Sequence, residues 1–335
     1  MRVATFNAGL AVGVLPHVQE RLPAVLASLA ELEVDVLFVQ EFWLEEHWLA
    51  LRERVRERLP HALRPPPLAV AHGSCSERDL GPLRTCAQQH CAGLRDEALA
   101  RCVVQHCAPV ALRLPTDCLN CIASNPHGTL EEITNRCTGT ADAPRGQTRG
   151  GLVAYGGSFG TGLLLRHQPL ASGGLTFASS INARGAQFAR LPSSTLGQLD
   201  IFAAHLSPGG AEQAPQVDEL LAWIDETTIK GPALLLGDLN TSPGSALFRR
   251  ITAAGFRSAG DARGTYSGEG LASGRFGDDG WRLDHVLVRG EHLTAPTTRI
   301  LDEARTIDVE GRPLRSTLSD HAGLLATLSS SSRAE

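Results

Sequence analysis

The sequence predicts a mixed α/β fold in which packed β-sheets are covered by helices and a cysteine-rich helical insertion interrupts the chain. Short apolar runs alternate with amphipathic helical patterns over residues 1–71 and 146–328, as in layered α/β domains. All eight cysteines lie between Cys75 and Cys137. The 335 residues are 42% hydrophobic and 20% charged, which excludes a disordered or collagen-like chain.

The elements expected before the insertion are two strands and two helices. The strands are Val3–Asn7 and Asp35–Val39, and one helix carries Leu22, Val25, Leu26 and Leu29 with Pro23 in its first turn, while Trp48, Leu51 and Val55 mark the other. After the insertion we expect strands at Gly162–Arg166, Ala186–Leu191, Leu199–His205, Ala233–Leu236, Leu283–Val288 and Gly323–Leu328 and helices at Gln216–Glu226 and Ala246–Ala253. Residues 329–335 are expected to form a disordered tail.

The insertion, residues 72–145, contains no aromatic residue, so it buries little apolar area and needs covalent or metal cross-links. Ala92–Arg101 has a helical composition, and a pair of cysteines lies on either side of it. The simplest geometry is a helical hairpin with disulfides Cys86–Cys107 and Cys91–Cys102, although other pairings are open. The alternatives are free thiols or a zinc site, for which the candidates are Cys118, Cys121, His90, His106 and His127.

Disulfides favour an oxidising compartment, outside the cytoplasm or secreted. Met1 and Arg2 lead directly into a strand without a signal-peptide pattern, which favours either a cytoplasmic protein or a chain whose signal was removed. The cysteines favour the second. No apolar run is long enough for an integral membrane segment. The formal charge of -5 gives no general basic field for nucleic acid, although a local groove can still be basic.

Polar residues stand at or next to the ends of the apolar runs. They are Asn7, Glu41, His205, Asp238, Asn240, Asp284, Asp320 and His321. Taken singly, each has a plain interpretation: Glu41 as a surface acid, Asp238 and Asn240 as an Asx turn, His205 as a core histidine. Together they place carboxylates, amides and imidazoles at one edge of a sheet, where a hard cation with oxygen ligands would bind.

The motifs T-F-N, V-Q-E, A-H-L, G-D-L-N, L-D-H and S-D-H run in order from Thr5 to His321. In this order they resemble the endonuclease/exonuclease/phosphatase superfamily of metal-dependent phosphoesterases. The resemblance implies a four-layer sandwich of two mostly antiparallel β-sheets flanked by helices. It also implies hydrolysis of a phosphodiester with Mg²⁺, or with Mn²⁺ or another divalent cation.

The resemblance also implies roles for single residues. Glu41 would be the main metal ligand, with Asn7 and Asp320 in or near the coordination shell. Asp238 would orient or deprotonate the attacking water, and Asp284 would orient the imidazole of His321; either Asp238 or His321 takes the proton.

Phosphate contacts would come from three further side chains. His205 and Asn240 would donate hydrogen bonds to phosphoryl oxygens, and Arg184 is a second candidate for that role. His285, which directly follows Asp284, is expected to be structural.

Substrate class is less well indicated. Q-E-F-W at Gln40–Trp43 and the segments at Thr161–Leu164 and Arg184–Ala186 look like the neutral-sphingomyelinase-like branch, whereas Gly280–Asp284 looks like the abasic-site nucleases. The chain departs from those nucleases at Ala204–Leu206, where they carry a Tyr-x-Pro-Asn motif. We therefore expect a sphingomyelinase or phospholipase C-type enzyme, then a secreted nuclease, and third an inactive binding module. Its partner would be a phospholipid head group, with peripheral membrane contact, or nucleic acid; the oligomeric state stays open.

Overall fold

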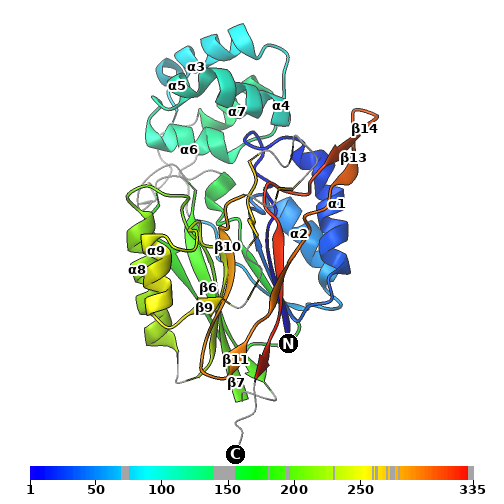
Figure 1. Ribbon diagram of the computed structural model, residues 1–335. Helices are drawn as coiled ribbons and strands as arrows, with labels where there is room; N and C mark the ends of the chain where they lie inside the picture. The colour runs from blue at the N-terminus through cyan, green and yellow to red at the C-terminus, as the bar shows by residue number, and fades with distance from the viewer. Residues whose placement is uncertain are drawn as a thin grey trace, which may run out of the picture.

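The computed structural model describes residues 1–68, 75–138, 155–179, 182–193, 197–228, 231–258, 260, 263–268, 271, 276–277 and 280–330. Within these residues two six-stranded β-sheets pack face to face, and helices cover their outer faces (Figure 1). The four-layer architecture implied by the sequence motifs is therefore confirmed.

The first sheet has the strand order β12-β15-β1-β2-β4-β3. Its strands are β1 (Arg2–Asn7), β2 (Val36–Gln40), β3 (His61–Leu63), β4 (Gly162–Leu165), β12 (Thr297–Ile300) and β15 (Gly323–Thr327). Only the central pair β1–β2 is parallel among the described pairings of this sheet. Both of these strands are buried almost throughout, as central strands covered on two faces must be.

The second sheet has the order β5-β6-β7-β8-β10-β9. Its strands are β5 (Ala171–Phe177), β6 (Arg184–Ser193), β7 (Gly197–His205), β8 (Ala233–Asp238), β9 (Arg257–Ser258) and β10 (Asp284–Arg289). Here too the central pair, β7–β8, is parallel and its described neighbours are antiparallel. Both sheets are therefore mostly antiparallel, with one parallel pair at the centre.

Three apolar layers hold the sandwich together. Phe38 and Ile201 belong to the core between the two sheets. Helices α1 (Val18–Glu31) and α2 (Glu45–Val55) cover the first sheet, while α8 (Gln213–Thr227) and α9 (Ala246–Ala253) cover the second. Alternate residues of the central strands face the inter-sheet core and the helices, which explains their nearly continuous apolar runs in the sequence.

The structure corrects several expectations. Pro23 lies in the second turn of α1 and not in the first, because the helix begins at Val18. Ser329 and Ser330 form strand β16 against β11 (Leu293–Thr294), so they do not belong to a disordered tail. Residues 331–335 lie outside the described residues. Strands β3, β5, β9 and β12 and the hairpin β13 (Arg305–Val309) with β14 (Arg312–Ser316) were not predicted.

The insertion is helical and fully cross-linked. It contains α3 (Glu77–His90), α4 (Asp96–Cys102), the π-helical turn Val103–Cys107, α5 (Ala108–Ala111), α6 (Thr116–Ser124) and α7 (Leu130–Cys137). Two disulfides, Cys86–Cys107 and Cys91–Cys102, join α3 to the following helices as predicted. The expected helix Ala92–Arg101 begins later, at Asp96.

Cys118 and Cys121, the half-site of the zinc alternative, instead pair with Cys75 and Cys137. No free cysteine remains, so the zinc and free-thiol alternatives are wrong. The backbone N–H of Cys75 donates to the carbonyl of Cys137 at 3.0 Å, which brings the two ends of the helical region together. The expected boundaries of the insertion, His72 and Arg145, lie outside the described residues.

The insertion lies over one end of the sandwich, above the edge at which β1 ends (Figure 1). Its α6 packs beside the short segment Tyr155–Gly157, and its α4 lies against the loop between β1 and α1. Among the described residues, no helix combines the length and the apolar character that crossing a bilayer requires.

Candidate active site

The predicted site residues converge because the strands that carry them share one edge. Asn7 ends β1 and Gln40, its parallel register partner, ends β2 directly before Glu41. In the second sheet Asp238 ends β8 and faces Asp284, the first residue of the antiparallel β10. The strand ends that carry these residues therefore lie at the top of the two sheets, on the side of the insertion (Figure 1).

Asn7 connects the two sheets at this edge. Its Nδ2 atom donates hydrogen bonds to Glu41 Oε1 at 3.3 Å and to Asp238 Oδ2 at 3.0 Å. Its Oδ1 atom accepts from the backbone N–H of Gly9 at 3.1 Å. One buried amide thus fixes a carboxylate of each sheet relative to the other.

Asp238 is buried and sits at the centre of the cluster. Its Oδ1 atom accepts a hydrogen bond from the backbone N–H of Asn240 at 2.9 Å, and its Oδ2 atom lies 3.5 Å from His205 Nε2. Burial raises the pKa of Asp238 to about 7, and the nearby charge of Asp284 acts in the same direction. Asp238 can therefore exchange a proton near neutral pH.

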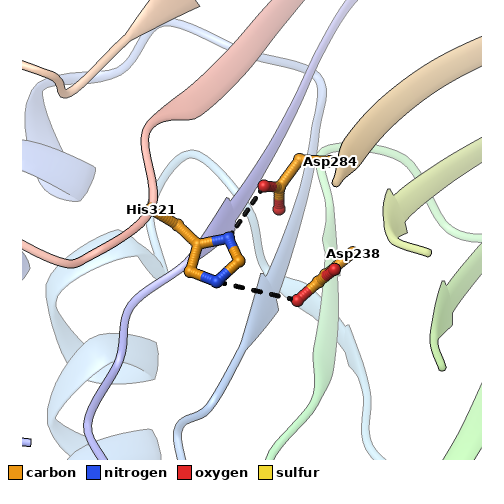
Figure 2. Close-up of side chains that lie close together, drawn as sticks. All are labelled: Asp238, Asp284 and His321. Carbon is orange, nitrogen blue, oxygen red and sulfur yellow. Dashed lines mark hydrogen bonds and ion pairs between the residues drawn. The ribbon is translucent and has the colours of Figure 1, made fainter. Parts of the chain in front are cut away.

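His321 and Asp284 form a buried pair (Figure 2). Nδ1 of His321 lies 2.8 Å from Asp284 Oδ2, and its Nε2 lies 3.9 Å from Asp238 Oδ2. Burial lowers the pKa of His321, but the charges of Asp284 and Asp238 outweigh that effect and hold it well above its usual value. The imidazole is accordingly charged at neutral pH, with Asp284 as its counter-ion.

Thr265 holds Asp284 in place, although the sequence did not identify it. Its buried Oγ1 atom accepts hydrogen bonds from the backbone N–H groups of Leu283 and Asp284, both at 3.0 Å. The next residue, Tyr266, places its ring 4.9 Å from the ring of His321. Both residues come from a loop without an apolar pattern, so only the folded chain reveals them.

Glu41, Asn7 and Asp320 fit a divalent cation by their chemistry. Burial raises the pKa of Glu41, and the carboxylate of Asp320 raises it further, whereas Arg184 and His321 lower it. A cation bound here would relieve that crowding of negative charge, and carboxylate and amide oxygens are the ligands that Mg²⁺ prefers. Gly9 keeps the space open, since a Cβ atom there would lie 2.8 Å from Asp320 Oδ1.

A second group could also hold a metal ion. The ligand atoms of Asp238, Asp284 and His321 lie within 4.8 Å of one another. However, Nδ1 of His321 faces Asp284 at hydrogen-bond distance and must carry its proton to donate, so that nitrogen is not a metal ligand. This geometry favours a proton-handling group over a closed metal site.

His205 and Arg184 line the cluster on the side of the second sheet. Nη1 of Arg184 contacts both ring nitrogens of His205, with Nδ1 at 2.7 Å, and because arginine only donates, the imidazole accepts from it and is neutral. Burial and the charge of Arg184 hold the pKa of His205 well below its usual value, and a lowered pKa is consistent with a neutral imidazole. The guanidinium carbon of Arg184 also lies 5.7 Å from the ring of Trp43, which stacks on Tyr155.

Asn240 and His285 occupy supporting positions. Asn240 has a left-handed φ of 49°, and its Nδ2 atom donates to the carbonyl of Leu206 at 2.9 Å. One of its two amide hydrogens is thereby used within the fold. His285 is buried and bonds the carbonyl of Thr241 at 2.7 Å, as expected for a structural histidine.

Comparisons with known proteins bear on this arrangement. A family model described as the Endonuclease/Exonuclease/phosphatase family matches residues 4–321. A search of the curated proteins gives no match.

Several solved structures share the fold. Sphingomyelinase C from Streptomyces griseocarneus is 16% identical with a TM-score of 0.59, and the alignment covers 97% of this chain and 98% of that one. A mannosyl-6-phosphatase from Bacteroides thetaiotaomicron is 14% identical (TM-score 0.58, 98% and 99% covered). Beta toxin from Staphylococcus aureus, in a structure with bound magnesium ions, is 12% identical (TM-score 0.57, 97% and 98% covered). At these identities the similarity concerns the fold alone.

Proposed function

The chain belongs to the endonuclease/exonuclease/phosphatase family, whose members are hydrolases of phosphoester bonds, and we propose that it is a divalent-metal-dependent phosphodiesterase of the sphingomyelinase or phospholipase C type. The observation that carries the proposal is the contact chain Glu41–Asn7–Asp238–His321–Asp284 at one edge of the sandwich, in which every side chain except the partly exposed Glu41 is buried. An inactive binding module would have no need of so many buried ionisable groups, which are costly to desolvate.

In this proposal Glu41, Asn7 and Asp320 hold the cation. When bound, Mg²⁺ would supply a positive charge that neutralises the phosphoryl and leaving oxygens. Asn7 would set the distance between that charge and Asp238, because its amide hydrogen-bonds Glu41 and Asp238 at once.

Asp238 is the residue that we propose takes the proton of the attacking water. The sequence left this role open between Asp238 and His321. With its pKa raised to about 7, Asp238 is a competent base near neutral pH, whereas His321 is already charged. His321 would instead donate from Nε2 to an oxygen of the phosphoryl group, with Asp284 keeping the imidazole charged and oriented.

Arg184 and His205 would bind the phosphoryl group from the side of the second sheet. The Nε atom of Arg184 is buried without a hydrogen-bond partner among the described residues, so it has a donor to spare for a ligand. A neutral His205 can donate one ring N–H, and Asn240 retains one amide hydrogen. These donors would stabilise the negative charge that develops in the transition state.

Nucleic acid is the second candidate substrate. Trp281 is 69% exposed and lies three positions before Asp284 in the chain. An exposed indole at this position could stack on a nucleobase. This observation keeps a secreted nuclease as the alternative.

The four disulfides support a location in an oxidising compartment, outside the cytoplasm. A panel assay tests the proposal: sphingomyelin, a lysophospholipid, plasmid DNA and RNA, each with Mg²⁺ and with EDTA. We expect Mg²⁺-dependent release of a phosphorylated head group from a lipid. Cleavage of DNA or RNA alone would replace the lipid proposal by the nuclease alternative, and no hydrolysis of any substrate would contradict both.

A further inference from the structure

Arg21 is a completely buried arginine in α1 that takes no part in the chemistry proposed above. Its Nη1 atom donates to the carbonyls of Ala8 at 3.2 Å and Leu318 at 2.6 Å. Its Nη2 atom donates to the carbonyl of Gly9 at 2.6 Å, and Nε donates to that of Pro16 at 3.0 Å. One guanidinium thus joins two stretches of backbone that are far apart in the chain.

These two stretches carry candidate metal ligands. Ala8 and Gly9 directly follow Asn7, and Leu318 precedes Asp320 by two positions. The planar guanidinium fixes the spacing of several carbonyls at once, which a lysine ammonium on a flexible stem cannot reproduce.

The burial of this cation is costly. Burial lowers the pKa of Arg21 to about 10, opposed by the charges of Asp320, Glu97 and Glu41, so the guanidinium remains charged at neutral pH. An apolar side chain here would avoid this desolvation cost but would leave the carbonyls of Ala8, Gly9 and Leu318 without these donors. Retaining a charge here is explained by what its hydrogen bonds hold in place.

The insertion contacts the same helix at its beginning. Oε1 of Glu97, in α4, accepts from the backbone N–H of Val18 at 3.4 Å, and the N-cap residue His17 makes no side-chain cap of its own. A carboxylate at a helix N-terminus satisfies a free N–H and interacts favourably with the helix dipole. Ala100 of α4 also packs against the loop before α1, where a Cβ atom on Gly13 would lie 2.8 Å from the Cβ of Ala100.

We propose that Arg21 is a positioning residue for Asn7 and Asp320, and that Glu97 extends this support into the disulfide-linked insertion. The insertion is then a structural part of the active site, although it contributes no candidate ligand. The inference rests on the proposed function, because it takes Asn7 and Asp320 as ligands of a divalent cation.

The test compares three variants of the full-length, disulfide-bonded protein with wild type. Arg21→Lys keeps the charge and removes the planar set of donors; Glu97→Ala removes the helix cap. Glu77→Ala is the matched control, since Glu77 pairs with Arg84 inside the insertion much as Glu97 pairs with Arg101. The readouts are the rise in Tm on adding Mg²⁺, Mn²⁺ affinity by calorimetry, and the Mg²⁺ concentration that gives half-maximal activity.

We expect Arg21→Lys to weaken metal binding by about tenfold, as changes behind metal ligands do. Glu97→Ala should weaken it less, and Glu77→Ala should behave like wild type. If Arg21→Lys does not fold, Glu97→Ala still decides the question, because Glu77→Ala shows what losing a glutamate–arginine pair inside the insertion does by itself. If Glu97→Ala and any folded Arg21→Lys bind metal as tightly as wild type, the positioning role is wrong but the proposed metal site stands. If wild type itself binds neither Mg²⁺ nor Mn²⁺, both the proposed metal site and this inference are wrong.

Discussion

The Nδ1 atom of His321 lies 2.8 Å from Oδ2 of Asp284, and both side chains are buried. The other oxygen of Asp284 has no hydrogen-bond partner among the described residues. The imidazole is therefore the side-chain partner of this carboxylate, and the two side chains should act as one unit.

A double-mutant cycle tests this unit. Asp284→Asn removes the counter-ion and His321→Ala removes the imidazole, so each should lower kcat by orders of magnitude. Because each change disables the same His321–Asp284 pair, the double variant should be little worse than the worse single variant. Losses in kcat that multiply fully would show that the two residues act independently.

Glu41→Gln tests the main proposed metal ligand. The substitution keeps the size of the side chain and removes the charge that a hard divalent cation requires. We expect activity to fall by orders of magnitude and the Mg²⁺-induced rise in Tm to disappear, with an unchanged circular dichroism spectrum. Glu45→Gln is the control, because its side chain is 66% exposed and pairs with Arg64. Wild-type turnover of Glu41→Gln at saturating Mg²⁺ would remove Glu41 from the ligand set.

Thr265→Val tests the support behind Asp284. Valine has the shape of threonine without the hydroxyl that accepts from two backbone N–H groups, so Asp284 should lose its fixed position. We expect kcat to fall about tenfold, as for other supporting contacts, with KM changing little, and Thr265→Ser to recover most of the loss. A serine variant as impaired as the valine variant would indicate a packing role for the threonine methyl group instead.

His285 predicts a pH dependence of stability. Burial lowers its pKa to about 3, so below the usual pKa of histidine the unfolded chain binds a proton that the folded chain does not. Stability is therefore lost as the pH falls from 6.5, by about 3 kcal/mol at pH 4 for this residue. In His285→Gln the difference between the free energies of unfolding at pH 7 and pH 4 should shrink by about this amount. An unchanged difference in urea melts would contradict the buried neutral state.

Packed sheets with helices outside were predictable because the central strands are buried on both faces, whereas the four-layer sandwich was implied only by the resemblance of the motifs to a known family. Val36–Gln40 and Ala233–Asp238 have continuous apolar runs that end in polar residues, and both features are visible locally. Strand β5 was missed because its sequence is glycine-containing and largely exposed, with no alternation. The β13–β14 hairpin was missed because its strands are polar, although Glu310 and Gly311, both with positive φ, mark its turn.

The disulfides show the same limit. Cys86, Cys91, Cys102 and Cys107 lie symmetrically about the predicted helix Ala92–Arg101, so two bridges followed from spacing. The bridges of Cys75 and Cys137 depend on how α6 and α7 pack, and nothing in the local sequence encodes that.

The residues that we propose for the chemistry could be nominated together from the sequence, since they stand at or near strand ends, and the structure brings those strand ends to the same edge. Those that support them were not. Arg21 looks like an ordinary polar position of an amphipathic helix, and Thr265 lies in a loop without periodicity. Their roles depend on backbone groups from distant parts of the chain, which only the tertiary structure brings together.

We propose that this edge of the sandwich is a metal-dependent phosphodiesterase site with Asp238 as its proton acceptor. The most direct measurement is hydrolysis of bis(p-nitrophenyl) phosphate by wild type and Asp238→Asn, with Mg²⁺, with EDTA, and after Mg²⁺ is restored. We expect wild type to hydrolyse the substrate with Mg²⁺, to stop with EDTA and to recover when Mg²⁺ is added back, while the folded variant is inactive throughout. Hydrolysis that persists in EDTA, or equal rates for wild type and Asp238→Asn, would contradict it.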